Sequence, residues 1–474
     1  MADFFRTTHF QQKAAHVERM SRATLRRTGM EPQLEEAQRL GRKIVVMSLG
    51  DPGANGFPPH RLLTDCLETA VHDRRSYNYT TSFGLPELRE RLKHTSLSDP
   101  GSVSREPSAY HGVETYLTVG GSEAAFCAIA PWTLGDGNIA VHEFIFVIHT
   151  AATWANGGFT ASYPLTEDAR PDLDYLVLLL DGAPVRCAVA TTIGNPIGSE
   201  MSESDIVKML QIAQTRIQQT GEPLVLVIDP AYEGSKVGVF EKSMPLDPIE
   251  IAIRHGIETP MVVTETASKT HAACGLRLGC LRLFWPEHIL PEWRADFIKY
   301  LETMLLPMLG KVPTLTQVAF CRLLERFEKN PAERSEYIEY LKARSRTMEA
   351  NLKYVLDSLR SIKGVYLARY YEKMQQLSAY YLMFGFEALQ RMYGSGHNQT
   401  VSFADFSLQT GCPMIRCVPS QSFLTPDTVR NHPAMIRVTA ALTPRADADL
   451  FLESVAAYAK HLETGSGALV QVPL

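Results

Sequence analysis

Between residues 116 and 284, short apolar segments alternate with amphipathic ones, and this alternation most constrains the fold. Runs typical of buried strands cover residues 116–119, 139–141, 158–163, 187–192, 224–228, 261–265 and 280–284. Segments with helical spacing lie between them, at residues 123–130, 150–155 and 203–220. Residues 175–180 fit either a buried strand or a helix. Because parallel strands need crossover connections, the pattern predicts an α/β fold with a mainly parallel sheet covered by helices.

The pattern changes on both sides of this region. Residues 291–359 have almost continuous helical spacing, and further strands are expected at 364–367, 379–384, 414–418 and 435–439, before a last helix at 446–462. Residues 388–405 are polar and suggest a flexible segment near a site. At the other end, helical periodicity over residues 1–42 fits a plain surface helix and an arm that crosses onto a partner subunit equally well. A strand at 43–48 and a helix at 60–72 are expected to follow.

A chain of 474 residues exceeds one typical domain, so we expect two. The predicted division is an N-terminal arm with part of a small domain (1–60), a large domain (61–335) and a C-terminal small domain (336–474). A net charge of −5 argues against nucleic-acid binding, and no apolar run is long enough to span a membrane. The eight cysteines lack the paired spacing of a metal site. We therefore expect a soluble cytoplasmic protein without a bound metal.

The stretch 264–280 (TETASKTHAACGLRLGC) contains one lysine, Lys269, among small and hydroxylated residues. A lysine amine attacks carbonyls when it is partly desolvated or lies near other cations. Thr266, Ser268 and the later Arg277 supply groups that bind phosphate. The stretch suggests an aldehyde cofactor with a phosphate tail, pyridoxal 5′-phosphate, although a surface lysine beside a glycine-rich turn fits this stretch alone equally well.

Other parts of the chain supply what this cofactor needs. A carboxylate must keep the ring nitrogen protonated, and Asp229 ends a predicted strand, where an open α/β sheet places ligand groups. Backbone N–H groups at a helix start bind phosphate, and an arginine binds a substrate carboxylate. The remaining candidates are Tyr232 and Asn195 for the phenolic oxygen, Phe146 for the ring face, His149 behind Asp229, Gly121 and Ser122 for the phosphate, and Arg437 for the substrate.

Each candidate also has a simpler interpretation. Asp229 is placed to cap a helix before Pro230, and Asn195 precedes a proline in what reads as an ordinary turn. Phe146 fits a core position, and Arg437 fits a pair with a surface acid. What favours the functional interpretation is that all of them occur together.

In the order of these motifs the chain resembles the class I/II aminotransferases, which are fold type I pyridoxal-phosphate enzymes. The resemblance runs from about residue 45 to 456. The family's N-P-x-G, D-x-x-Y, S-x-S-K and G-x-R-x-G match residues 195–198, 229–232, 266–269 and 275–279, and Arg277 follows Lys269 by eight residues as in the family. Two departures are Thr266 in place of serine and His142-Glu143-Phe144 in place of P-x-P. Residues 387–421 are also longer and more polar than expected.

The resemblance implies a large domain with a mainly parallel seven-stranded sheet sandwiched by helices, and a smaller α+β domain. It also implies a homodimer with shared active sites, because Tyr79, in Y-x-x-x-x-G-L-x-x-L-R, corresponds to a tyrosine that reaches the phosphate of the neighbouring subunit's cofactor. Gly50, before D-P, corresponds to a glycine whose backbone touches the substrate carboxylate.

The implied activity is transamination of an α-amino acid through aldimine, quinonoid and ketimine intermediates, with Lys269 as the base. An alternative is another reaction on the same fold: β- or γ-elimination, γ-substitution or carbon–carbon bond formation, in the manner of 1-aminocyclopropane-1-carboxylate synthase acting on S-adenosylmethionine. The unusual residues 142–144 and the polar segment near His397 motivate this alternative. A third hypothesis is a non-catalytic regulator that binds the cofactor as a sensor.

Overall fold

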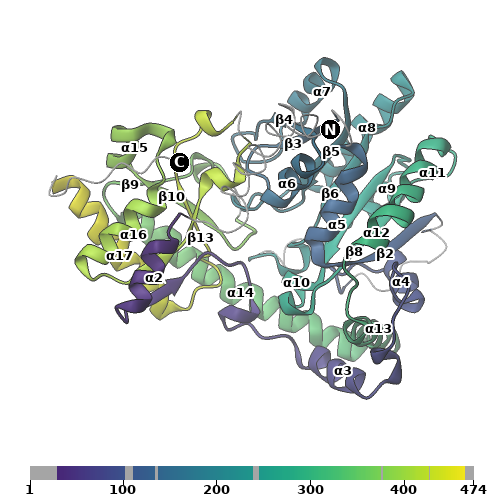
Figure 1. Ribbon diagram of the computed structural model, residues 1–474, viewed down its shortest axis with the longest axis horizontal. Coiled ribbons are helices and arrows are strands. Elements are labelled where there is room, and N and C mark those ends of the chain that lie inside the picture. Colours follow the sequence, from purple (N-terminus) through teal and green to yellow (C-terminus); the bar gives the residue numbers. More distant parts are fainter. Residues whose placement is uncertain are drawn as a thin grey trace, which may run out of the picture.

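A computed structural model describes residues 29–101, 110, 112–133, 137–238, 245–374, 377–425 and 428–464. Figure 1 shows two lobes side by side, which we call the large and the small lobe. The large lobe contains a seven-stranded sheet with the order β2-β8-β7-β6-β5-β3-β4. Its strands are β2 (Val113–Val119), β3 (Asn138–His142), β4 (Phe159–Tyr163), β5 (Val185–Thr191), β6 (Val225–Asp229), β7 (Met261–Thr266) and β8 (Leu278–Phe284).

Strand β8 runs antiparallel to both of its neighbours, and the other pairs are parallel. The expected mainly parallel seven-stranded sheet is therefore confirmed. Successive residues of β6 point to opposite faces, so Leu226 and Ile228 join one buried cluster while Val225 and Val227 join another. The sheet is thus buried on both faces, as its near-continuous apolar strands require.

Helices cover both faces. One face packs against α7 (Leu173–Gly182), α8 (Glu203–Thr220) and α9 (Pro248–Arg254), and the other against α5 (Gly120–Ile129), α6 (Val147–Ala155) and α11 (Pro291–Tyr300). Helix α8 has the predicted bounds because Ser202 and Asp205 form a capping box at its start and Gly221, with φ of 67°, ends it. Beneath them, α3 (Arg61–Val71), α4 (Pro86–Lys93) and α13 (Thr314–Lys329) form a further apolar cluster with β2 and β8.

Two local predictions need correction. Residues 175–180 lie in helix α7, and a strand there is wrong. Asp172 caps this helix, and the buried residues Leu173, Leu176 and Leu180 recur at helical spacing. Helix α5 starts at Gly120, three residues before the predicted start, so the Gly-Gly-Ser turn is its first turn.

The small lobe combines the start and the end of the described chain. Strand β1 (Ile44–Val46) pairs in parallel with β11 (Met414–Arg416). The strands β12 (Val418–Pro419), β13 (Ile436–Val438), β10 (Leu382–Phe386) and β9 (Val365–Leu367) form an antiparallel sheet in that order. Helices α2 (Glu31–Arg39), α15 (Glu387–Tyr393), α16 (Gln399–Thr410) and α17 (Arg445–Thr464) surround these strands.

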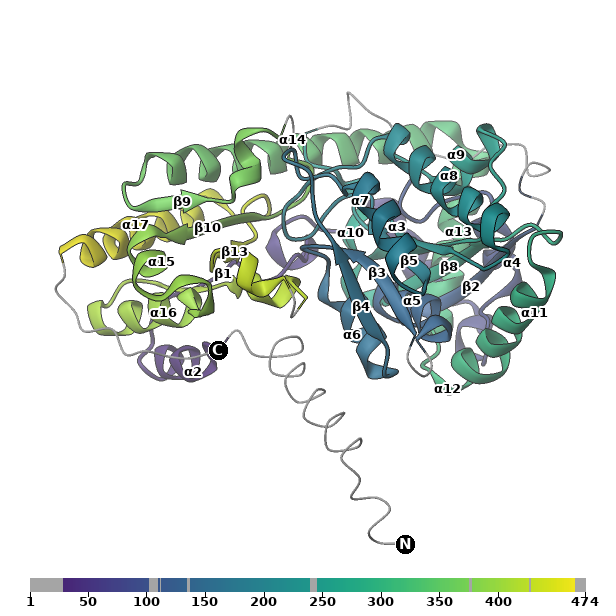
Figure 2. The same cartoon turned by 90° about the horizontal axis from the view of Figure 1, so that it is seen from above.

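Helix α14 (Pro331–Ser361) has 31 residues and runs along both lobes, as Figure 2 shows. It therefore crosses the predicted boundary between the large domain and the C-terminal small domain at residue 335. The domain limits stay a prediction. Of the arm predicted over residues 1–42, residues 1–28 lie outside the described residues, and residues 31–39 form α2 of the small lobe. No helix in the described ranges is both long enough and apolar enough to cross a membrane.

The segment 388–405 is not a flexible loop. It forms α15 and most of α16, and many of its polar side chains are buried and bonded. Asn398 caps α16, the side chain of Gln399 accepts a hydrogen bond from the backbone of Phe386, and His397 lies 2.7 Å from the Ser402 hydroxyl. Polar composition was misleading here because these groups satisfy one another inside the lobe.

Arg282 on β8 is fully buried, and its guanidinium lies 3.0 Å from both Asp247 and Glu265. We expect Arg282→Met to lower the free energy of unfolding by about 3–5 kcal/mol, because it leaves two buried carboxylates without their cation. The measurement is denaturant-induced unfolding. Arg254→Met is the control: it breaks the half-exposed pair with Glu203 and should cost less than about 1 kcal/mol. Equal losses in the two variants would contradict this account.

Candidate functional site

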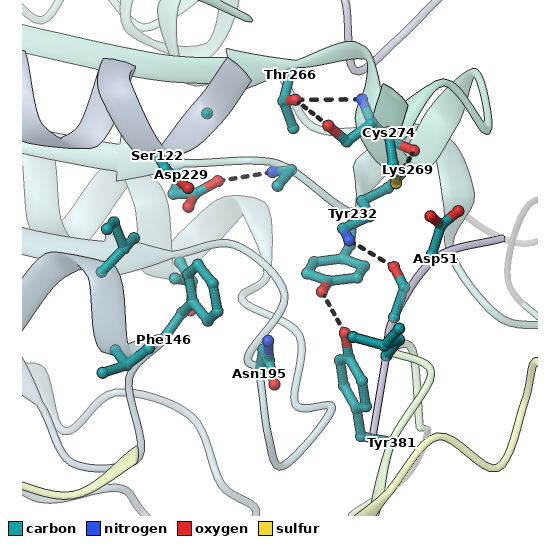
Figure 3. A pocket seen from close by; sticks show the side chains of 18 of the residues that line it. Asp51, Ser122, Phe146, Asn195, Asp229, Tyr232, Thr266, Lys269, Cys274 and Tyr381 are labelled. Carbon is teal, nitrogen blue, oxygen red and sulfur yellow. Dashed lines mark hydrogen bonds between the residues drawn. The ribbon is translucent and has the colours of Figure 1, made fainter. Parts of the chain in front are cut away.

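A cavity of about 520 Å³ lies where the two lobes meet. Most predicted site residues line it: Gly50, Gly121, Ser122, Phe146, Asn195, Asp229, Tyr232, Thr266, Ser268, Lys269, Arg277 and Arg437. Figure 3 shows several of them facing one another across the cavity. His149 lies behind Asp229, and Tyr79 lies outside the cavity. The chain thus brings together residues more than 380 positions apart.

One part of the cavity is lined by groups of the kind that bind anions. Helix α5 starts there, and Gly121 and Ser122 in its first turn line the cavity. Thr266 and Ser268 bond to each other, with 2.8 Å between their hydroxyl oxygens. The Arg277 guanidinium donates to the carbonyls of Val119 and Cys274, which fixes it beside the helix start. Hydroxyls, an arginine and free N–H groups at a helix N-terminus are what a phosphate needs.

This part of the cavity depends on a close approach of backbone segments. Gly120 has φ of 76°, and a Cβ placed there would lie 2.3 Å from Nη2 of Arg277. A Cβ on Gly279 would lie 2.5 Å from the carbonyl carbon of Gly120. Because neither glycine has a side chain, β8 and the preceding residue Arg277 pack directly against the start of α5.

Asp229 lies at the carboxyl end of β6, in the middle of the cavity wall. One of its oxygens accepts a hydrogen bond from the backbone of Ala231, and the other lies 3.2 Å from Nε2 of the buried His149. His149 donates through Nδ1 to the Phe146 carbonyl, which directs Nε2 toward Asp229. The pair matches the predicted arrangement of an acid with a histidine behind it.

Lys269 follows β7, in the short helix α10 (Ala267–Thr270), and its side chain reaches into the cavity. Its Nζ donates to the carbonyl of Gly50 at 2.5 Å and lies 5.9 Å from the centroid of the Tyr232 ring. Thr266 caps α10 by accepting from the Ser268 backbone, which sets the position of the lysine. The amine therefore lies between the large lobe and the first loop of the small lobe.

Arg437, on β13, is 5% exposed. It donates to the carbonyl of Ser48 and, at 3.4 Å, to the side-chain oxygen of Asn195. Its guanidinium carbon lies 4.3 Å from the Tyr381 ring centroid and 5.1 Å from that of Phe423. Burial lowers the pKa of Arg437. It pairs with no carboxylate among the described residues, so it does not form the surface ion pair of the simpler interpretation.

Sequence analysis missed several residues that line the cavity, among them Tyr381, Arg416, Phe423, Cys274 and Asp51. Among them, Tyr381 contacts a predicted site residue directly: its hydroxyl lies 2.8 Å from the Tyr232 hydroxyl (Figure 3). No local pattern marks Tyr381, which directly precedes an ordinary apolar strand. Asp51 is the one with a visible signal, since it follows Gly50 in the turn already assigned to the site.

The unusual residues 142–144 lie outside the cavity lining. His142 is buried, contacts Thr191 at 3.2 Å, and burial lowers its pKa to about 4. Glu143 binds two small-lobe groups: Nε2 of His432 at 2.7 Å and the Tyr370 hydroxyl at 2.9 Å. Burial alone would raise the pKa of Glu143, but hydrogen bonds, chiefly from His432, lower it overall. These residues thus tie the two lobes together.

The cavity fits pyridoxal phosphate, the cofactor that the resemblance implies. The anion-binding end, the acid at Asp229 and the amine of Lys269 lie along one wall, and Phe146 lines the cavity at the start of α6. Nε of Arg437 is buried and makes no hydrogen bond within the described structure. Buried polar atoms of this kind are rare unless a partner binds nearby. No cluster of three potential metal ligands occurs among the described residues.

We expect Gly120→Ala to weaken binding of pyridoxal phosphate about tenfold or more, because the added methyl displaces Arg277 from the anion site. Equilibrium dialysis with free pyridoxal phosphate measures this. The control is Gly221→Ala, which has a similar φ of 67° but no atom within 4 Å of the added carbon. Unchanged affinity in Gly120→Ala, with the fold intact by circular dichroism, would argue against this anion site.

Comparison with known proteins agrees with the geometry. The family model for aminotransferase class I and II matches residues 42–455. No curated protein matches the chain. Among solved structures, an aminotransferase from Escherichia coli has 20% identity and a TM-score of 0.66, with 90% of this chain and 94% of that chain covered.

An alanine aminotransferase from Pyrococcus furiosus has 18% identity and a TM-score of 0.68, covering 91% of this chain and 96% of its own. For the aspartate aminotransferase of Rhizobium meliloti the identity is 18% and the TM-score 0.66, with 91% and 95% covered. These likenesses support the fold, and the family match extends over nearly the whole described chain. The protein therefore belongs to the class I and II aminotransferase family and has its fold type I architecture.

Proposed function

We propose that this protein is a pyridoxal-phosphate-dependent aminotransferase that acts on an α-amino acid. Family membership supports the reaction type, and the cavity supports the cofactor and the substrate class. The observation that carries the proposal is Arg437, a buried cation without an anionic partner among the described residues, in the same cavity as the Lys269 amine. A buried charge is costly unless it is paired, so the site favours a ligand that brings a carboxylate.

Pyridoxal phosphate, when bound, supplies an aldehyde that condenses with amines and a ring that accepts electrons. Lys269 would hold it covalently at rest, and its freed amine would then move a proton from the α-carbon of the substrate to the former aldehyde carbon of the cofactor. Asp229 keeps a proton on the ring nitrogen, with His149 behind it. Tyr232 donates toward the phenolic oxygen, as Asn195 does.

The remaining residues orient the two ligands. Gly121, Ser122, Thr266, Ser268 and Arg277 hold the phosphate, and Phe146 covers one face of the ring. Arg437 grips the substrate carboxylate, with Asn195 and the backbone of Gly50 beside it. Because these groups come from both lobes, a bound substrate is enclosed between them and shielded from water.

The other reactions of this fold are less favoured. The two features that motivated them do not face the cavity: His142 bonds to Thr191, while His397 stacks on Tyr393 and bonds to Ser402. No described residue that lines the cavity points specifically to elimination or carbon–carbon bond formation. The cytoplasmic location stays a prediction.

The test mixes the purified holoenzyme with a panel of amino acids and measures release of 2-oxo acids. We expect conversion of the cofactor to its amine form with at least one amino acid. Lys269→Ala should abolish both 2-oxo acid release and the absorption band of the lysine-bound cofactor, because no other amine takes its place. Lys208→Ala, at an exposed lysine paired with Asp174, should retain both. Loss of the amino acid without any oxo acid would reject transamination.

We also propose a homodimer with shared sites. Tyr79 is 96% exposed, lies outside the cavity of its own chain and faces Lys311 at 5.9 Å, so its ring is available to a second copy. Tyr77 and Met308 are exposed as well, at 73% and 77%. Large apolar side chains of this kind are typical of a subunit interface.

Mixing two inactive variants tests the shared site. We expect Lys269→Ala and Tyr79→Ala each to have little activity alone. After refolding them together, about half of the dimers are hybrids, each with one intact site, so activity should return to about a quarter of the wild-type value. Failure of the mixture to regain activity, although hybrids form, would place Tyr79 in the site of its own chain or outside any site.

A further inference from the structure

Tyr381 touches three of the proposed site residues, although no role follows from its sequence position. It directly precedes β10 and is 2% exposed. Its hydroxyl lies 2.8 Å from that of Tyr232, and its ring lies 4.3 Å from the Arg437 guanidinium carbon. A Cβ on Gly50 would lie 1.9 Å from the Tyr381 hydroxyl, so this oxygen fills the space that a glycine leaves. Tyr381 thus joins the cofactor side to the substrate side.

A hydroxyl has one proton to donate, so the direction of the Tyr381–Tyr232 hydrogen bond determines what Tyr232 offers the cavity. If Tyr381 donates, the Tyr232 proton is free for an acceptor in the cavity. If Tyr232 donates, it presents only lone pairs there. Burial, together with Tyr381, raises the pKa of Tyr232 well above its usual value, so Tyr232 keeps its proton at neutral pH.

We propose that Tyr381 is a positioning residue: its hydroxyl donates to Tyr232 and so directs the Tyr232 proton toward the phenolic oxygen of pyridoxal phosphate. This inference rests on the proposed function. Hydrogen bonds in a chain polarise one another, so donation from Tyr381 makes Tyr232 a stronger donor. The Arg437 guanidinium against the Tyr381 ring and the tight contact with Gly50 hold the phenol in place.

The consequence is electrostatic. A strong hydrogen bond from Tyr232 withdraws negative charge from the phenolic oxygen, and that charge would otherwise stabilise a proton on the nitrogen contributed by Lys269. Tyr381 therefore keeps this nitrogen easier to deprotonate. Removing only its hydroxyl should make the proton harder to lose while leaving the ring, and its contact with Arg437, in place.

The experiment compares Tyr381→Phe with the wild-type holoenzyme by titrating the cofactor absorption band with pH. We expect the midpoint of the colour change to rise by about 0.5–1 pH unit, the size of a lost hydrogen bond. Tyr380→Phe is the control, because Tyr380 is equally buried and packs edge-to-face on the same Tyr232 ring, 5.2 Å between centroids. Its midpoint should match the wild type.

A double variant shows whether Tyr381 acts through Tyr232. In a Tyr232→Phe background, Tyr381→Phe should move the midpoint no further, because the relay is already broken. An unchanged midpoint in the single variant, or an equal additional shift in the double variant, overturns the inference while leaving the aminotransferase proposal intact. If wild-type protein with pyridoxal phosphate shows no lysine-dependent band, both proposals fall together.

Discussion

The close approach of β8 to the start of α5 is the constraint on which the site depends. A Cβ on Gly279 would lie 2.5 Å from the carbonyl carbon of Gly120, and a Cβ on Gly120 would lie 2.3 Å from Nη2 of Arg277, so both positions require a glycine. Since β8 runs antiparallel between β2 and β7, the turn that carries Arg277 returns beside the α5 N-terminus. The same turn begins with α10, which carries Lys269. One packing contact thus places the anion site and the reactive amine side by side.

The second constraint is the set of polar bonds that cross between the lobes. Arg437 of the small lobe donates to Asn195 of the large lobe, and Lys269 donates to Gly50. Glu143, three residues before the α6 N-cap Phe146, adds buried contacts with His432 and Tyr370. In this chain, the departure from the usual P-x-P therefore has a structural explanation. It holds the lobes together close to Phe146, which lines the cavity.

Much of the large lobe was predictable because its signals are local. Strand ends, caps and the alternation of elements are encoded within windows of about ten residues, which is why Asp229 and Lys269 could be proposed as candidates near strand ends, and both line the cavity. Residues 175–180 could not be assigned to a strand or a helix from the sequence, because a short apolar run fits both periodicities until the cap of the helix at 173–182 is recognised. The segment 388–405 failed for the opposite reason: its polar groups are satisfied by one another, and that pairing is not visible in composition.

The position of Tyr381 at the cavity could not be predicted, because it depends on where the small lobe places β10 relative to Tyr232, 149 positions earlier. The charged side chains of the cavity also come from separate parts of the fold. Arg277, beside the start of α5, and Arg437, on β13 of the small lobe, line the same cavity as Lys269 and Asp229. Two arginines that are buried or half-buried, in a cavity that also contains the acid Asp229 and the amine of Lys269, favour a pair of ligands that are each anionic at the outer end. A cofactor with a phosphate and a substrate with a carboxylate meet this condition. Their opposite, reacting ends would then lie together at Lys269.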